Sequence, residues 1–150
     1  MRLAGRVALV SLAVSVLVLP TVASATDATL KVTLATWSRQ ITVDARSLQA
    51  SAQQRHPRQL VTIAGRFRRD ALAARRALAA GRPSSSQGGR GRKLGLAAFA
   101  EYAIVGREWA LVGRSRLRKQ RAAAIRYAAL AKQHALNGGR LLIAAGKLLT

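Results

Sequence analysis

Apolar residues recur at intervals of three and four along nearly all of the chain after residue 26. No segment alternates apolar and polar residues for long enough to predict a strand. Intervals of three and four place apolar side chains on one face of a helix, where each residue advances by about 100°. The sequence therefore predicts an all-α protein in which each helix buries one face.

The first two helices have recognisable boundaries. Thr26 or Asp27 can cap the start of the first helix, and Pro57 ends it because the residue before a proline disfavours helical geometry. Pro57 also suits the first turn of a second helix, which Gly81 and Pro83 terminate. The residues predicted to face the core are Leu30, Leu34, Trp37, Ile41, Ala45, Leu48 and Ala52, followed by Leu60, Ala64, Phe67, Ala71, Ala74 and Leu78.

Residues 82–92, with the sequence RPSSSQGGRGR, contain no apolar side chain and are rich in turn-forming residues. We expect a flexible loop here. The loop is too short to separate two domains that each have a core, so residues 26–150 are predicted to form a single domain.

A third apolar stripe begins at Leu94, is interrupted at residues 113–119, and resumes at Ala123. Two interpretations fit this pattern. One unbroken helix over residues 93–136 would be roughly 66 Å long, against about 36 Å for the second helix, and its excess length would have no packing partner. We therefore favour a break near Gly113 to Ser115.

Asn137-Gly138-Gly139 predicts a further break near the end of the chain, before the apolar segment RLLIAAGKLLT. The expected architecture is an antiparallel four-helix bundle with a short C-terminal extra helix.

Residues 1–25 have the three parts of a secretory signal peptide. Arg2 and Arg6 form a basic start, residues 7–19 are apolar except for two serines, and Ala23-Ser24-Ala25 supplies the small residues that signal peptidase reads. An apolar run of about 13 residues is shorter than the roughly 20 that a membrane-spanning helix needs. We expect cleavage after Ala25 and a secreted or periplasmic protein.

The chain has 26 basic residues, five acidic residues and no cysteine. The first 25 residues contain two of the bases and none of the acids, so the remaining chain has a formal charge of +19. Without cysteine, an exported protein has no disulfides, thiolate metal sites or thiol catalysis. A GC-rich genome also favours Arg and Ala, so the abundance of Arg is by itself weak evidence of function.

The sequence lacks the groupings that common catalytic and metal sites need. Its two Glu and two His are too few for a di-iron bundle site, and neither Glu101 nor Glu108 has a His three residues later. No Gly-x-Ser-x-Gly motif is present. We interpret His56 and His134 as capping or surface residues and expect no enzymatic activity, metal or cofactor.

The positive charge predicts a cationic binding surface. The partners that an exported cationic protein meets first are anionic envelope polymers and anionic lipid headgroups. Nucleic acid is less favoured because no recognition motif or aromatic stacking platform is present. Membrane disruption by the segment RLLIAAGKLLT is less favoured than packing of that segment on the bundle. The candidate residues for polyanion binding are Arg66, Arg69, Arg76, Arg114, Arg116, Arg118, Lys119 and Arg121.

An alternative function needs none of this charge. Helical bundles place ligand sites between their helices. A cavity of this kind would let the protein carry an apolar small molecule. Its predicted lining is Trp37, Ile41, Phe67, Tyr102 and Trp109.

The acidic residues predict a structural role. Asp44, Asp70, Glu101 and Glu108 lie on or beside the predicted apolar stripes. Because a partly buried carboxylate needs a charged or hydrogen-bonding partner, we expect these groups to pair with Arg across helix interfaces. Chance placement on helix flanks is the alternative.

Overall fold

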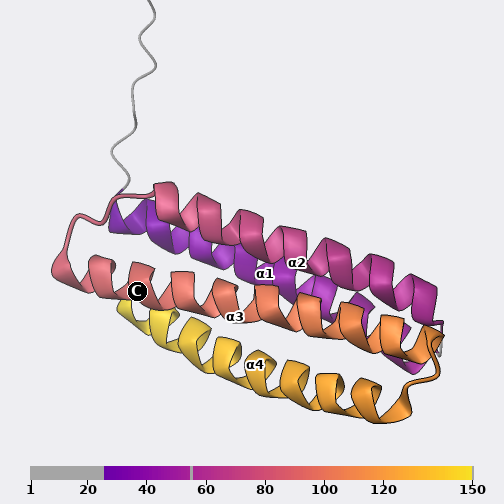
Figure 1. The fold of residues 1–150 in the computed structure, drawn as a ribbon. Coiled ribbons are helices and arrows are strands. Elements are labelled where there is room, and N and C mark those ends of the chain that lie inside the picture. The colour runs from indigo at the N-terminus through magenta and orange to yellow at the C-terminus, as the bar shows by residue number, and fades with distance from the viewer. Residues whose placement is uncertain (1–25, 55, 150) are drawn as a thin grey trace, which may run out of the picture.

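The computed structural model describes residues 26–54 and 56–149, which form four helices joined by short connections (Figure 1). They are α1 (Asp27–Gln53), α2 (Pro57–Ala80), α3 (Ser86–Leu117) and α4 (Arg121–Leu148). The all-α prediction is confirmed. The predicted signal peptide and its cleavage site lie outside the described residues.

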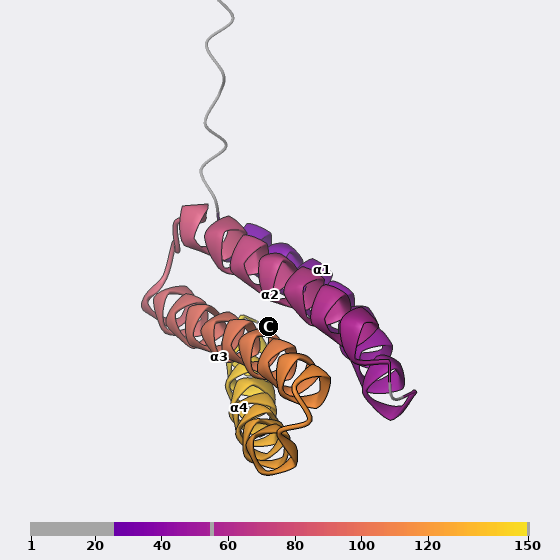
Figure 2. The same cartoon turned by 45° about the vertical axis from the view of Figure 1, so that its right-hand side comes forward.

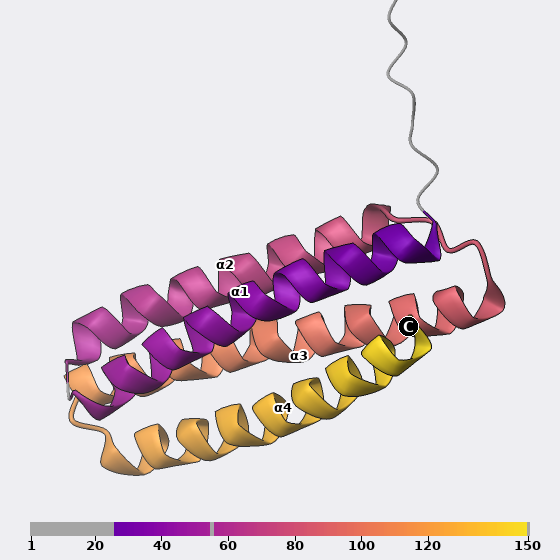
Figure 3. The ribbon, with the colours of Figure 1, turned by 180° about the vertical axis from the view of Figure 1, so that it is seen from behind.

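The four helices pack in chain order. α3 packs extensively against both α2 and α4, whereas α1 packs mainly on α2 and makes few contacts with α3 or α4. Figure 2 shows α4 tilted away from the direction that the other three helices share. Seen from behind, α4 runs beside α3, on the side away from α1 and α2 (Figure 3). The fourth side of the bundle, between α1 and α4, is therefore the least closely packed.

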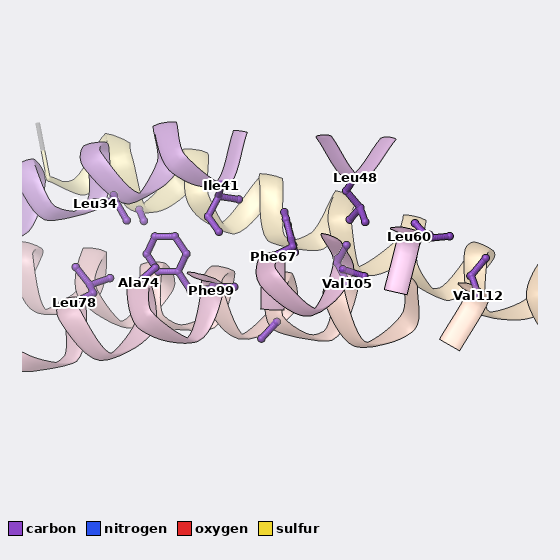
Figure 4. Close-up of a cluster of buried hydrophobic side chains, with 14 of the residues drawn as sticks. Leu34, Ile41, Leu48, Leu60, Phe67, Ala74, Leu78, Phe99, Val105 and Val112 are labelled. Carbon is purple, nitrogen blue, oxygen red and sulfur yellow. The ribbon is translucent and has the colours of Figure 1, made fainter. Parts of the chain in front are cut away.

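Most of the core lies between α1, α2 and α3, where side chains from the three helices point at one another (Figure 4). Ala124 and Ala145 of α4 and the following Leu149 complete it. All six residues predicted to face the core on α2 are buried. On α1, Leu30, Leu34, Ile41 and Leu48 are buried, but Ala45 is exposed, and the neighbouring Asp44 is buried instead. The prediction for Ala45 is wrong because α1 has a close neighbour only on the α2 side, which narrows its buried face.

The start of α1 confirms one of the two predicted caps. The side chain of Thr26 accepts a hydrogen bond from the backbone N–H of Thr29 at 3.4 Å. Asp27 serves a different purpose, since its carboxylate accepts hydrogen bonds from the backbone N–H of Ser84, at 2.8 Å, and from the hydroxyl of Ser85.

These contacts help to explain why the predicted flexible loop at 82–92 is wrong. Ser85 is the N-cap of α3 and accepts a hydrogen bond from Gly88 N–H at 2.9 Å, so residues 86–92 are helical and only residues 81–85 connect α2 to α3. A Cβ atom on Gly88 would lie 1.9 Å from a carboxylate oxygen of Asp27. Of the glycines that resemble a linker in the sequence, Gly88 allows the start of α3 to approach α1, and Gly91 allows it to approach Leu149.

The predicted break between the third and fourth helices exists, but it lies at residues 118–120 instead of 113–115. Gly113 is buried inside α3, where a Cβ atom would lie 2.8 Å from the carbonyl oxygen of Pro57. Helix α3 ends when Lys119 adopts the left-handed conformation at φ 58°. The N–H groups of Gln120 and Lys119 bond to the carbonyls of Ser115, at 2.8 Å, and Arg116, at 3.1 Å, which is the Schellman pattern.

The predicted C-terminal extra helix is wrong, because α4 continues through Asn137-Gly138-Gly139 to Leu148. Gly138 is buried against α3, and a Cβ atom there would lie 3.3 Å from the ring of Tyr102. Residues 140–148 form the end of α4, and Ala145 and the C-cap residue Leu149 are buried in the core. Among the described residues, no helix combines the length and hydrophobicity needed to cross a membrane.

Candidate functional site

The structure separates the eight predicted polyanion-binding residues into two groups. Arg66, Arg69 and Arg76 are exposed along α2 and spread over about 15 Å of its axis. The other five flank the turn between α3 and α4, and we call them the basic end: Arg114, Arg116, Arg118, Lys119 and Arg121.

The basic end contains a cavity of about 370 Å³. Three predicted cations, Arg116, Lys119 and Arg121, line it together with the apolar side chains of Ala124, Ile125 and Ala128. Arg114 and Arg118 are exposed but do not line it. No acidic residue is part of the lining, so the cavity combines a concentrated positive charge with an apolar wall.

The N-terminus of α4 lies beside this cavity, because Arg121, the first residue of α4, lines it. Gln120 occupies the N-cap position without a capping hydrogen bond from its side chain, and no acidic residue lies in the first turn. The first N–H groups of a helix have no intrahelical partner, and the helix dipole favours negative charge near them. The α4 N-terminus therefore favours an anion on the same side as the cations.

Arg116 has a second contact that fixes its position. Its Nη1 donates a hydrogen bond to the carbonyl oxygen of Ala52 at 2.9 Å, in the last turn of α1. Helix α1 has no basic residue of its own in that turn, so Arg116 supplies the cation that a helix C-terminus favours. Arg92 does the same at the end of α2, where its Nε donates to Leu78 O at 3.2 Å.

The acidic residues have partners elsewhere in the fold. Asp44 and Arg66 approach to 3.6 Å across α1 and α2, which confirms the predicted cross-helix pairing for this carboxylate. Glu101 pairs across α3 and α4, but with His134 at 2.5 Å instead of an Arg. The prediction is wrong for Glu108, whose partner at 2.7 Å is Arg107, the preceding residue on the same helix. None of these pairs lies at the basic end.

Asp70 lies beside Asp44, so two carboxyl groups meet at the α1–α2 interface. Burial, followed by hydrogen bonding and charge repulsion with Asp44, raises the pKa of Asp70 above 3.8, and Arg66 and Arg69 oppose this shift. Asp44 accepts a hydrogen bond from Gln40 at 3.2 Å through Oδ1, while its buried Oδ2 has no hydrogen-bond partner. A protonated Asp70 would supply that missing donor.

The interpretation of His134 as a capping or surface residue is wrong, because His134 lies half-buried in the interior of α4, which extends to Leu148, and pairs with Glu101. His56 is the N-cap residue of α2, although its side chain makes no capping hydrogen bond. Among the described residues, no group of three or more His, Cys, Asp or Glu side chains is placed to hold a metal ion.

A second cavity, of about 430 Å³, opens between α1, α3 and α4. Three of its five predicted aromatic or apolar lining residues are present: Phe67, Tyr102 and Trp109. Ile41 instead belongs to the buried core, and Trp37 lines a separate hollow beside Asp70. The described residues that line it are Ala45, Leu48, Gln49, Ala52, Gln53, Phe67, Tyr102, Val105, Trp109, Arg116 and Ala135.

Two of the aromatic side chains that line this apolar cavity pack against each other. The rings of Phe67 and Tyr102 meet edge to face, with centroids 6.2 Å apart and planes at 81°. Burial raises the pKa of the Tyr102 hydroxyl, as expected for a phenol in an apolar environment. The sequence gives no sign that Ala45 or Ala135 lines a cavity, because that depends on the separation of α1 from α4.

The two cavities share Arg116. Comparison of the chain with protein-family models, curated proteins and solved structures finds no match. The chemistry of the two cavities is therefore the basis for proposing a function.

Proposed function

We propose that this is an exported, non-enzymatic protein that binds anionic groups of the cell envelope in the cavity at its basic end. The ligand chemistry is phosphate or carboxylate, presented by an anionic polymer or by lipid headgroups. The observation that carries the proposal is a 370 Å³ cavity lined by Arg116, Lys119 and Arg121 and by no acidic side chain.

The charge at this cavity is not cancelled by nearby acids. The nearest acidic residue along α3 is Glu108, eight residues before Arg116 and thus about 12 Å away along the helix axis. Helix α4 contains no acidic residue. Because the Debye length at physiological ionic strength is about 8 Å, the cavity keeps a positive potential that Glu108 does little to reduce.

Two double variants distinguish binding of an anion in the cavity from the general attraction of anions to a basic protein. The Lys119→Gln/Arg121→Gln double variant removes two cations from the cavity lining. The matched control, Arg114→Gln/Arg118→Gln, removes two exposed cations from the same end that do not line the cavity. Both double variants lower the net charge by two.

Affinity would be measured with soluble polyphosphate and with phosphatidylglycerol vesicles, each across a salt series, with phosphatidylcholine vesicles as the neutral reference. We expect the cavity variant to lose about tenfold in affinity, which corresponds to about 1.4 kcal/mol, and the control to lose much less. Binding to polyphosphate alone would identify a polymer ligand, and stronger binding to the anionic vesicles would identify lipid headgroups.

Equal losses in the two double variants would show that only net charge matters, and would contradict the proposal. So would complete loss of wild-type binding at about 150 mM salt, since charges separated by more than a Debye length are largely screened there.

The apolar cavity supports a second candidate function, the carriage of an apolar small molecule. Its volume of about 430 Å³ lies within the usual range for small-molecule sites, which is about 300–1,000 Å³. Extraction of the purified protein with organic solvent and mass spectrometry would test this function, because a carrier is expected to retain an apolar molecule from its source.

A further inference from the structure

We propose that the two cavities form one continuous site for a single-chain amphiphile with an anionic headgroup. The hydrocarbon chain would lie in the apolar cavity between α1, α3 and α4, and the headgroup would lie among the cations of the basic end. This inference rests on the proposed function, because it uses the same cations to bind the headgroup.

The position of Arg116 connects the two cavities. Its side chain lines both of them, and its Nη1 is bound to the carbonyl of Ala52, a residue that itself lines the apolar cavity. A guanidinium group has five N–H donors, so the bond to Ala52 leaves donors for an anionic headgroup. A headgroup held by Arg116 would therefore place the first carbons of its chain beside Ala52.

The walls of the apolar cavity suit a hydrocarbon chain. Leu48, Phe67, Val105 and Trp109 supply aliphatic and aromatic surface. Among the described residues that line this cavity none is acidic, and Arg116 is the one that carries a charge. A wholly apolar molecule would leave the neighbouring cations unused, whereas a polymer of charged units would leave the apolar wall unused. An anionic amphiphile complements both parts.

The opening of the cavity lies where the bundle is least closely packed. Helix α1 makes few contacts with α4, and α4 is tilted away from the other helices (Figure 2). Ala45 and Gln49, both exposed on α1, and Ala135 on α4 belong to the lining. A chain can therefore enter from the side without unfolding a helix, and a larger side chain at Ala45 would obstruct the opening.

The test uses decanoate as the probe, with decan-1-ol as the neutral chain and acetate as the anion without a chain. Equilibrium dialysis would give affinity and stoichiometry for the wild-type protein. We expect decanoate to bind at one molecule per chain, and at least about tenfold more tightly than decan-1-ol or acetate.

Two kinds of variant distinguish binding of the ligand's hydrocarbon chain from binding of its anionic headgroup. Ala45→Phe should weaken decanoate and decan-1-ol by about tenfold or more, while Ala35→Phe, at an exposed α1 position outside the cavity, should weaken neither. Lys119→Gln/Arg121→Gln should weaken decanoate but not decan-1-ol. Gln49→Phe provides a second obstruction at an exposed position, and circular dichroism would verify that each variant is folded.

Polyphosphate affinity, measured on the same variants, distinguishes the two proposals. If decanoate binds no better than acetate, or if Ala45→Phe and Gln49→Phe leave its affinity unchanged, the amphiphile site is wrong, and intact polyphosphate binding would leave the proposed function standing. If Lys119→Gln/Arg121→Gln weakens neither polyphosphate nor decanoate, the proposed function is wrong as well.

Discussion

At the scale of single residues, the adjacent carboxyl groups of Asp44 and Asp70 are unexpected in a chain with 26 basic residues. Asp44 is buried and paired with Arg66, and one of its oxygens has no hydrogen-bond partner. Asp70 has a raised pKa because burial and Asp44 both disfavour its charge. The folded protein therefore binds a proton at Asp70 more tightly than the unfolded chain does.

This linkage predicts that Asp70→Asn stabilises the protein at pH 7. A raised folded pKa means that the contribution of Asp70 is greatest below its unfolded value of 3.8 and is lost as the pH rises through the folded pKa. We expect the melting temperature of the variant to be about 2–4 °C higher at pH 7 and unchanged below pH 3.8, as measured by circular dichroism.

Asp27→Asn provides a control of opposite sign. Hydrogen bonds from Ser85 and Ser84 lower the pKa of Asp27 below 3.8, so its stabilising contribution is present above that value and is lost as the pH falls through the folded pKa. This variant should melt at a lower temperature than the wild type at pH 7. A lower melting temperature for Asp70→Asn at pH 7 would contradict the role assigned to the carboxyl pair.

At the scale of the helices, glycines inside α3 determine how closely its neighbours approach. A Cβ atom on Gly106 would lie 2.8 Å from the backbone nitrogen of Arg68 and 2.9 Å from the carbonyl oxygen of Ala64, both on α2. Backbone atoms do not move aside as a flexible side chain would. Gly95 and Gly113 are similarly close to residues of α2.

Gly106→Ala is therefore expected to destabilise the protein by about 1–3 kcal/mol, because overpacking forces α2 and α3 apart. Gly146→Ala is the matched control, since nothing lies within 4 Å of the added Cβ in α4. That variant should gain up to about 1 kcal/mol, because alanine loses less conformational entropy in a helix. Urea unfolding of both proteins gives the comparison, and a neutral Gly106→Ala would contradict close packing of the two helices.

In the turn between α3 and α4, Lys119 adopts a positive φ although it is not glycine, which costs conformational free energy. Lys119→Gly should stabilise the protein, relative to Lys119→Gln, by about 1 kcal/mol, because glycine adopts the left-handed conformation more readily. Both variants remove the same charge, so their difference in urea unfolding isolates the backbone. Equal stability of the two variants would show that Lys119 is not strained.

At the scale of the whole molecule, the positive charge is distributed over all four helices, whereas four of the five acids have a hydrogen-bond or ion-pair partner close by. Uncompensated like charges repel one another and destabilise the compact state. Raising the salt concentration from about 10 mM to about 150 mM shortens the Debye length from roughly 30 Å to about 8 Å.

We therefore expect the melting temperature to rise by several degrees over this salt range, as measured by scanning calorimetry. Sodium chloride and potassium chloride should act alike, because screening depends on ionic strength. A melting temperature that falls with salt would mean that the ion pairs outweigh the general repulsion.

The local pattern of the sequence was sufficient for much of the fold. The buried face of α2, the boundary at Pro57 and the cap at Thr26 were all predicted, because each depends on residues within a few positions of one another. Of the candidate site, the sequence supplied the cations of the basic end and three of the residues that line the apolar cavity. The sequence did not indicate that Arg116 lines both cavities.

Only the tertiary structure determined which neighbours the glycines and the arginines contact. Gly113 and Gly138 look like helix breaks in the sequence but lie inside helices, because an adjacent helix occupies the space that a side chain would need. The arginines that face solvent in a helical pattern differ in their neighbours: Arg66 pairs with Asp44, while Arg116 binds the end of α1 and lines two cavities.

Helical periodicity determines which face of a helix is apolar, since that is a local property of the backbone. The approach and tilt of neighbouring helices depend on contacts between distant segments, and these contacts place the two cavities side by side.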